Sequence, residues 1–473
     1  GSIAITPTGQ ARLFVSRAGV VIRATPHTHS EVLGPFQGGD VATVYAERGS
    51  VDYTAATFGA TYDSVPQAAV AGRTLALVGD SFTANGFYSD GSQMTRYGRN
   101  AIEWALALSN QPMTLISTSA VGGSAVTADN IGVRFMTQMQ SAIASGATDI
   151  HCMGGINDAL LGISLASVQA EYSRVIDYAL SSGKRLWLTT QPTMNAAYTS
   201  YSVARQAQML RLNDWLLDRV AVSFADRNLV VIDGAGATND PNSATADFRT
   251  NGSSDNLHPR NVGGYWLGKE IGRVWAASCP VWDRRCRSNA ANYGYSSVMG
   301  NNIVDNGLFT TGATPGTGWA QTYGGSASGT LSKVTRADGF GSNTQNVLTF
   351  TAADETATLA MSSNAFSRAV VGGTYVFQVE VTVAASPVNL KGVQATLQQN
   401  GDALYEAHSL APITASDVAL PEGFTATLRT PPVVLQAGKT ILLGRVRATA
   451  AGATAGGITL SVGRASLLRV DGY

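Results

Sequence analysis

Five residues in four separated stretches of the sequence have the chemistry of an acyl-transfer site. They are Ser81 in LALVGDS, Gly123 in SAVGGSA, Asn157 in GGIND, and Asp255 and His258 in DNLHP. A histidine can take the proton from a serine hydroxyl as general base, while a carboxylate orients the imidazole and stabilises its charged form. The oxyanion that forms needs hydrogen-bond donors, and the N–H groups of Ser81 and Gly123 and the side-chain amide of Asn157 would supply three.

The elements around these stretches predict that they meet at one edge of a sheet. Short apolar runs typical of buried strands alternate with segments that have helical periodicity. Such alternation predicts a parallel sheet covered by helices on both faces, with ligands bound beyond the carboxyl ends of its strands. Each of the four stretches follows an apolar run. The predicted strands are TLALVGD, MTLISTSAV, DIHCMGG, RLWLTTQP and LVVIDGAG.

The blocks GDSFT, SAVGGS, GGIND and DNLHP, in this order, resemble the four signature blocks of the SGNH hydrolases, also called the GDSL esterase/lipase family. The resemblance covers residues 73–278 and implies a flavodoxin-like, three-layer α/β/α fold. It implies that Ser81 is the nucleophile, that Asp255 and His258 complete the triad, and that Ser81, Gly123 and Asn157 form the oxyanion hole. Phe82 stands where the family often has leucine.

Each block taken alone also fits a structural role. Gly-Asp-Ser is a common turn, Asn157-Asp158 could be a helix N-cap, and the Asp-x-x-His stretch before Pro259 could be another cap. In the second block either glycine of Gly122-Gly123 could be the donor, and we favour Gly123 because it directly precedes a small polar residue. The catalytic interpretation therefore depends on the order of the blocks and on their shared position after strands.

The segments on either side of the predicted α/β domain have sequence patterns typical of β structure. Residues 1–72 contain short β-branched runs separated by Gly and Pro turns, which predict a small β-rich domain. Residues 73–298 form the predicted hydrolase domain. Residues 299–473 show alternating strands typical of a β-sandwich, here of jelly-roll type. The opening NIVDNGLFTTGATPGTGWAQT loosely resembles carbohydrate-binding modules, although we expect Trp319 to fill the core rather than stack on sugar.

The composition excludes several classes of partner. The 473 residues include 32 Lys and Arg and 32 Asp and Glu, so no net charge attracts nucleic acid or an anionic membrane. No apolar run is long enough to insert into a bilayer. We predict no cofactor and no metal, and interpret His27 and His29 as part of a surface turn. Cys279 and Cys286 could form a small disulfide loop or stay as two thiols.

These observations predict a serine esterase that removes O-acetyl or other short acyl groups from a polysaccharide. The loops GFYSDGSQMTRYGRN and TMNAAYTSYS are rich in Tyr, Ser, Asn and Arg, which suits a hydroxyl-rich ligand better than an acyl chain. A general carboxylesterase or lipase and a non-catalytic glycan-binding adhesin are the alternatives. The domain order is similar to that of modular phage tail proteins, which implies an extracellular location, secreted or on a virion, and a homotrimer in the tail case.

Overall fold

The computed structural model divides the chain into two compact units, Gly1–Ala71 and Gly72–Tyr473. It describes the backbone of the strands within residues 10–52. It also describes residues 73–471 except 90–92, 129–131, 222–227, 280–285, 287–288, 290–301, 363–364, 385–388, 400–405, 414, 440 and 455–456. The predicted boundary at residue 298 stays a prediction.

The first unit contains antiparallel β structure, as its β-branched runs predict. Strands β1 (Gln10–Ser16), β2 (Gly19–Thr25) and β3 (Glu31–Pro35) form a three-stranded sheet, and β4 (Thr43–Ala46) pairs with β5 (Gly49–Asp52). The predicted surface turn with His27 and His29 lies outside the described residues.

The α/β region, residues 73–279, is built on a five-stranded sheet that is parallel throughout. The spatial order is β12-β11-β10-β6-β9. Renumbered along the chain, this is the flavodoxin-like order 2-1-3-4-5, which confirms the predicted fold class. The strands are β6 (Thr74–Gly79), β9 (Thr114–Thr118), β10 (Asp149–Met153), β11 (Arg185–Thr189) and β12 (Leu229–Ile232).

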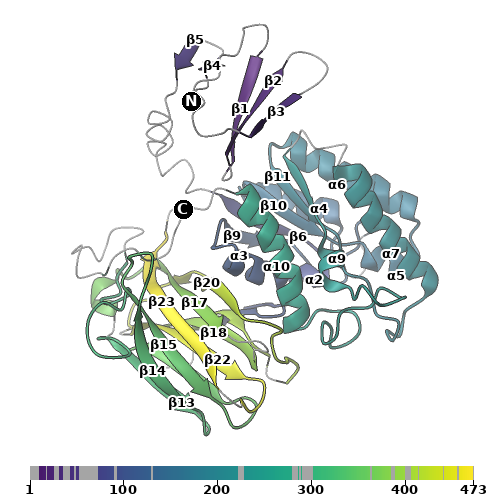
Figure 1. The fold of residues 1–473 in the computed structure, drawn as a ribbon. Helices are drawn as coiled ribbons and strands as arrows, with labels where there is room; N and C mark the ends of the chain where they lie inside the picture. Colours follow the sequence, from purple (N-terminus) through teal and green to yellow (C-terminus); the bar gives the residue numbers. More distant parts are fainter. Residues whose placement is uncertain are drawn as a thin grey trace. The chain divides into compact units, whose positions relative to one another are not determined.

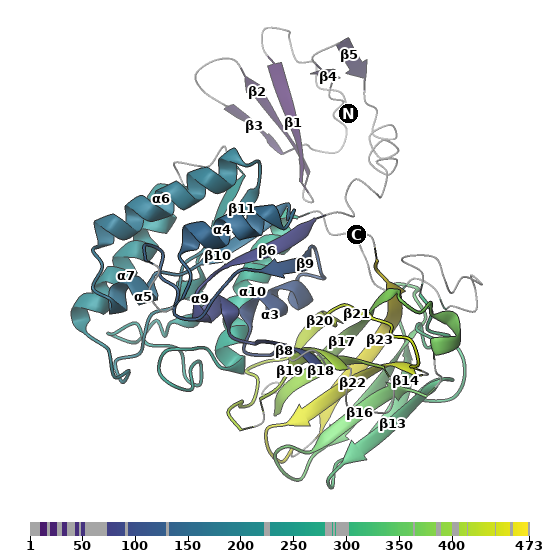
Figure 2. The same cartoon turned by 180° about the vertical axis from the view of Figure 1, so that it is seen from behind.

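Helices cover both faces of this sheet, as the two opposite views show (Figures 1 and 2). Alternate residues of β6 divide between the two resulting cores, with Leu75 and Leu77 in one and Ala76 and Val78 in the other. Helices α3 (Ala101–Leu108) and α10 (Asn261–Ser278) pack in the first core. The second core contains α4 (Phe135–Ala144), α6 (Leu165–Ser181) and α7 (Val203–Trp215), which continues as the π-helical turn Leu216–Val220.

Helix α10 packs closely on α3 because a row of glycines faces it. A Cβ atom on Gly268 would lie 2.4 Å from Trp104 Cβ, and one on Gly272 would lie 3.0 Å from the carbonyl oxygen of Ala105. The glycines lower helix propensity, and the periodicity of the sequence did not indicate this helix. Its position matters because it starts three residues after His258.

The sandwich region, residues 302–471, consists of two antiparallel sheets that enclose a single apolar core. Trp319 is 5% exposed, packs on Phe309 with ring centroids 4.9 Å apart, and donates its indole N–H to Asn306 O. It is therefore a core residue, as expected. The strands are β13 (Trp319–Gly324), β14 (Ser328–Thr335), β15 (Ser342–Thr349), β16 (Thr356–Met361), β17 (Thr374–Ala384), β18 (Leu390–Gln399), β19 (Glu406–Ala411), β20 (Phe424–Arg429), β21 (Val433–Val434), β22 (Leu442–Ala450) and β23 (Ile458–Arg469).

The α/β region contributes two strands to a sandwich sheet. The stretch after Ser81, which the sequence presents as a polar loop, forms the hairpin β7 (Phe87–Ser89) and β8 (Gln93–Tyr97). Strand β8 pairs in parallel with β19, so one sheet runs β13-β16-β22-β18-β19-β8-β7 (Figure 2). A polar alternating segment can complete a sheet edge that would otherwise leave backbone groups unpaired.

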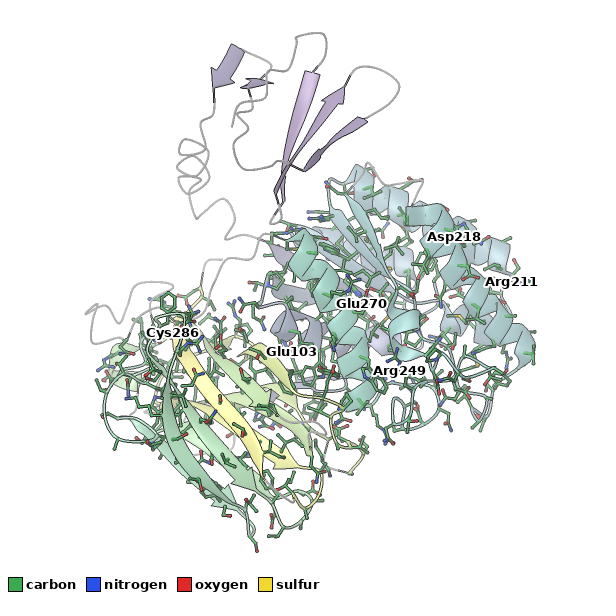
Figure 3. The ribbon with its side chains drawn as sticks, in the orientation of Figure 1. Glu103, Arg211, Asp218, Arg249, Glu270 and Cys286 are labelled. Carbon is green, nitrogen blue, oxygen red and sulfur yellow. The ribbon has the colours of Figure 1, made fainter. Side chains whose placement is uncertain are left out.

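Buried side chains reinforce this junction. Trp104 of α3 makes edge-on contacts with Tyr265 of α10 and Phe424 of β20, at ring-centroid distances of 5.1 and 5.2 Å. Glu103, labelled in Figure 3, accepts a hydrogen bond from the Ser409 hydroxyl on β19. The sandwich therefore shares a sheet with hairpin β7–β8 and a hydrophobic core with Trp104 of α3 and Tyr265 of α10.

Two further sequence observations concern the cysteines and membranes. No disulfide joins Cys279 to Cys286 in the described residues, and the Cys286 sulfur accepts a hydrogen bond from Asn302 Nδ2 at 3.1 Å. Cys152 is buried in the core, as its apolar surroundings predict. None of the helices in the described ranges has the length and hydropathy of a membrane-spanning segment.

Candidate active site

Ser81 lies at the carboxyl end of β6, the position that the sequence predicts. It is the first residue of the short helix α2 (Ser81–Ala84), whose N-cap is Asp80. The Asp80 carboxylate accepts a hydrogen bond from Phe82 N at 2.9 Å. This cap fixes the turn between strand and helix, and Ser81 remains partly accessible while Asp80 and Phe82 are buried.

The structure brings Ser81, His258 and Asp255 into one hydrogen-bonded chain. His258 Nε2 lies 2.9 Å from Ser81 Oγ, and His258 Nδ1 lies 2.7 Å from Asp255 Oδ2. Because an ionised carboxylate can only accept, Nδ1 carries the hydrogen and Nε2 accepts from the serine hydroxyl. The arrangement is that of a nucleophile, a general base and an orienting carboxylate.

Asp255 also organises the turn that carries the histidine. Its Oδ1 accepts hydrogen bonds from His258 N at 2.6 Å and Leu257 N at 3.0 Å. Partial burial opposes ionisation of Asp255, but the hydrogen bonds from the side chain and backbone of His258 outweigh it and lower the pKa of this carboxyl. Ser253 Oγ donates to the His258 carbonyl at 2.7 Å, and the ring of Phe82 lies 5.7 Å from the imidazole.

The two other predicted oxyanion residues lie at the same edge of the sheet. Gly123 has φ 79° in the turn closed by the hydrogen bond from Ser124 N to Val121 O, a conformation that favours glycine. A Cβ atom on Gly122 would lie 4.0 Å from Ser81 Cβ, so this turn faces the serine. The N–H groups of both glycines have no acceptor in the described residues, which leaves either able to donate.

Asn157 lies in helix α5 (Ile156–Leu160), directly after β10. Its Nδ2 donates one hydrogen bond to Ser124 O at 2.8 Å. A primary amide has two N–H hydrogens, so this bond orients the amide and leaves the second hydrogen for a ligand. The side chain is partly exposed. Ser81, Gly123 and Asn157 therefore belong to three adjacent segments at one edge of the sheet.

Asp158 is a site-forming residue that the sequence analysis considered only as part of a helix cap. It is completely buried, and its carboxylate accepts from Val126 N at 2.8 Å and from the N–H and hydroxyl of Thr127 at 3.1 and 2.7 Å. Burial raises its pKa, although these hydrogen bonds oppose the shift. Asp158 thus ties the segment after Gly123 to the helix of Asn157. In the sequence, the position of Asp158 next to Asn157 in GGIND was the feature that could have indicated its role.

Gln191 is a second residue that sequence reasoning missed. It is fully buried, its Nε2 donates to Asp80 Oδ2 at 2.8 Å, and its Oε1 accepts from Ile156 N at 2.9 Å. Its backbone is held by the side-chain amide of Asn213, which accepts from Gln191 N at 3.2 Å and donates to Gln191 O at 2.9 Å. One side chain therefore links the turn before Ser81 to the helix of Asn157. In the sequence, the position of this polar residue just after the strand RLWLT was the feature that could have indicated its role.

The titration of Asp80 reflects this buried network. Desolvation raises the pKa of Asp80 to about 7, against the opposing hydrogen bonds from Gln191 and Phe82. In the part of the chain that the structure describes, no group of three or more His, Cys, Asp or Glu side chains could hold a metal ion.

The α/β region resembles known proteins. Residues 75–271 match the family model of the GDSL-like lipase/acylhydrolases. No curated protein sequence matches the chain. Similar solved structures include a lipolytic protein of the G-D-S-L family from Desulfitobacterium hafniense DCB-2 (15% identity, TM-score 0.33, covering 43% of this chain and 99% of that one). A second is a lipase/acylhydrolase from Enterococcus faecalis (18% identity, TM-score 0.32, covering 44% of this chain and 98% of that one). A third is a carbohydrate acetylesterase family member from Sinorhizobium meliloti (14% identity, TM-score 0.33, covering 43% of this chain and 97% of that one).

The family match covers the segment that contains all the residues described above, and the sheet order is the one that the signature blocks imply. Residues 75–271 of this chain are therefore similar to the GDSL-like lipase/acylhydrolase family.

Proposed function

We propose that the protein is a serine esterase that removes O-acetyl or other short acyl groups from a polysaccharide. The observation that carries the proposal is the hydrogen-bonded chain from Ser81 Oγ through His258 to Asp255. Such a chain serves acyl transfer when oxyanion donors stand beside the nucleophile, and Gly123 and Asn157 occupy the neighbouring strand ends.

In the acylation step, His258 Nε2 takes the proton of Ser81 as Oγ attacks the ester carbonyl carbon. The Asp255 carboxylate stabilises the imidazolium through the Nδ1–H bond. The tetrahedral oxyanion accepts from the N–H groups of Ser81 and Gly123 and from the free amide hydrogen of Asn157. When the intermediate collapses, His258 returns the proton to the departing sugar hydroxyl, and the acyl group remains on Ser81.

Deacylation uses the same groups in the same order. His258 removes a proton from water, the hydroxide attacks the acyl carbon, and the oxyanion again occupies the three donors. Collapse of this second intermediate releases the carboxylic acid and returns the proton to Ser81 Oγ. The bond is an ester because an amide would require protonation of a much poorer leaving group.

The surroundings of the triad support a hydroxyl-rich substrate. The Tyr- and Ser-rich loop that follows β11 is bonded to the triad segment, since Asn195 N donates to Asn256 O at 2.9 Å. Tyr198 and Tyr201 of this loop remain partly accessible, and Tyr88 of hairpin β7–β8 is 48% exposed. Tyrosines offer sugar rings both a flat apolar face and a hydroxyl. An extracellular location, on a virion tail or secreted, goes with this proposal.

The test is acetate release from O-acetylated polysaccharides, measured beside hydrolysis of p-nitrophenyl acetate and a long-chain ester. Ser81→Ala is the variant, and Ser181→Ala, at an exposed site on α6, is the matched control. We expect acetate release that Ser81→Ala abolishes and Ser181→Ala retains. Preference for the long-chain ester would replace the proposal with a lipase. Glycan binding by a wild-type protein that hydrolyses no ester would replace it with an adhesin.

A further inference from the structure

Charged side chains gather where helix α10 begins against the loop that follows β19. Asn261, the first residue of α10, holds this loop by two hydrogen bonds, since its Nδ2 donates to Val418 O at 2.6 Å and its Oδ1 accepts from Val418 N at 3.2 Å. Arg260 and Asp417 are the chain neighbours of these two clamped residues. The clamp therefore brings the chain positions of an arginine and an aspartate from two different regions close together.

A second arginine reaches the same junction from the turn after β8. Gly98 N donates to Ala411 O at 2.8 Å, which fixes this turn on the end of β19. The backbone of the next residue, Arg99, lies against the first turn of α10, where a Cβ atom on Gly264 would come within 2.5 Å of the Arg99 carbonyl oxygen. Arg99 and Arg260 thus flank the α10 N-terminus together with Asp417.

Three buried polar atoms of this cluster have no hydrogen-bond partner. They are Arg99 Nε, Arg260 Nε and Asp417 Oδ1. In the described ranges, neither guanidinium forms a hydrogen bond or an ion pair with a protein group. Buried polar groups in folded proteins are almost always satisfied by protein, water or ligand. The terminal nitrogens of both guanidiniums are not among these buried atoms, and both arginine side chains are partly exposed, so the cluster can bind a polar ligand from solvent.

The charge balance of the cluster selects the kind of ligand. Burial raises the pKa of Asp417 to about 6, against the hydrogen bonds from the backbone of Ile413 and Asn261 and the charges of both arginines. This carboxylate is therefore mostly ionised near neutral pH. The cluster then contains one carboxylate and two guanidiniums, and one positive charge remains uncompensated. Guanidinium groups bind carboxylates through paired, charge-assisted hydrogen bonds. The missing partner is an anionic group with several acceptor oxygens.

The cluster is also joined to the reacting residues. Arg260 follows His258 by two residues. Asn100, next to Arg99, donates to Thr83 O at 3.2 Å, within the helix that starts at the nucleophile. A ligand held by the two arginines would therefore be held by the two segments that carry the base and the nucleophile.

Resting on the proposed esterase function, we propose that Arg99 and Arg260 bind the carboxylate of an acidic sugar. The substrate is then an O-acetylated polysaccharide that contains uronic or similar acidic residues, rather than a neutral one. The arginines select the chain to be deacylated, and the triad removes the acyl group.

The first experiment compares acetate release from O-acetylated polygalacturonate and from neutral O-acetylated glucomannan. We expect wild type to favour the acidic substrate in kcat/KM, and Arg99→Gln with Arg260→Gln to reduce that preference by about tenfold or more, as expected for lost charged hydrogen bonds. Arg211→Gln is the control, because Arg211 is exposed on α7, away from α10 (Figure 3). An equal wild-type preference for both substrates would overturn the proposal.

A binding experiment separates this inference from the proposed function. Binding of acetyl-free polygalacturonate to Ser81→Ala protein needs no catalysis. Raising NaCl from 0.05 to 0.5 M should weaken this binding, because both arginine side chains are partly exposed and salt screens charges that contact solvent. Arg99→Gln with Arg260→Gln should weaken the binding of polygalacturonate about tenfold. Arg99→Lys with Arg260→Lys should restore part of this binding. Salt-independent binding, or none, would overturn the arginine site even if esters are hydrolysed. Arginine-dependent binding without any ester hydrolysis would overturn only the proposed function.

Discussion

Replacement of Gln191 by leucine tests whether the site depends on the side chain that links its two halves. Gln191→Leu keeps the approximate volume but removes the bonds to Asp80 and to Ile156 N, both of which are buried. Each buried group left without a partner costs about 1–3 kcal/mol. We therefore expect the free energy of unfolding to fall by about 2–6 kcal/mol.

The kinetic effect follows from the position of Ile156. It directly precedes Asn157 in a helix of only five residues, so loss of its N–H bond loosens the amide that faces the oxyanion. Complete removal of one oxyanion donor costs about 10²–10³ in kcat. A misaligned donor should cost less, about tenfold to a hundredfold in kcat, or about 1.4–2.7 kcal/mol of transition-state stabilisation. KM for p-nitrophenyl acetate should change little.

Gln399→Leu provides the matched control for this substitution. Gln399 is also fully buried, with Nε2 donating to Val434 O at 2.6 Å and Oε1 accepting from Gln436 N at 3.1 Å. The assays are urea denaturation and steady-state hydrolysis of p-nitrophenyl acetate. Both variants should lose similar stability, and only Gln191→Leu should lose kcat. Equal loss of kcat in the two variants, or unchanged kcat in Gln191→Leu, would refute the positioning role.

Gln191→Glu adds a test that depends on pH. The introduced carboxyl would face Asp80, whose pKa burial already raises to about 7. Two buried carboxyls in contact must share at least one proton. The folded state therefore binds more protons than the unfolded state as pH rises from about 4 to 7, and stability falls in that direction. The deficit of Gln191→Glu relative to wild type should be small at pH 5.5 and larger at pH 8.5; a pH-independent deficit would contradict this account.

Two further predictions concern buried groups of the α/β region. Asp158→Asn supplies one acceptor oxygen where Val126 N and Thr127 N need two, so we expect a stability loss of about 1–3 kcal/mol and lower kcat for p-nitrophenyl acetate. A normal kcat in this variant would show that Asp158 does not position the turn that carries Gly123. Burial lowers the pKa of His151 to about 3, so at this residue only the unfolded state takes up a proton below about pH 6.5. The contribution of His151 to the free energy of unfolding therefore falls by about 1.4 kcal/mol per pH unit on acidification. His151→Leu should lack this contribution between pH 6 and 4 in urea denaturation curves; parallel pH profiles would show that His151 titrates normally.

The α/β fold could be predicted because its signals are local. Buried parallel strands are short apolar runs, and their helices carry apolar residues at three- and four-residue spacing. Helix α10 escaped this reasoning, since its glycines reduce helix propensity and serve instead the close contact with Trp104 and Ala105. Hairpin β7–β8 also escaped it, because a polar segment becomes a strand only when an edge such as β19 is there to pair with it.

For the candidate site, the sequence determined which residues could react and the edge of the sheet at which they would meet. Ser81, Gly123 and Asn157 follow β6, β9 and β10, and parallel strands bring such positions together. Asp255 and His258 lie in the long segment between β12 and α10. The tertiary structure alone decided how they are held, through Asp158 and Gln191, and that hairpin β7–β8 joins the sandwich. These contacts link residues far apart in the chain, such as Gln191 with Asp80. No local pattern specifies such pairs, because each depends on which buried groups folding leaves in need of a partner.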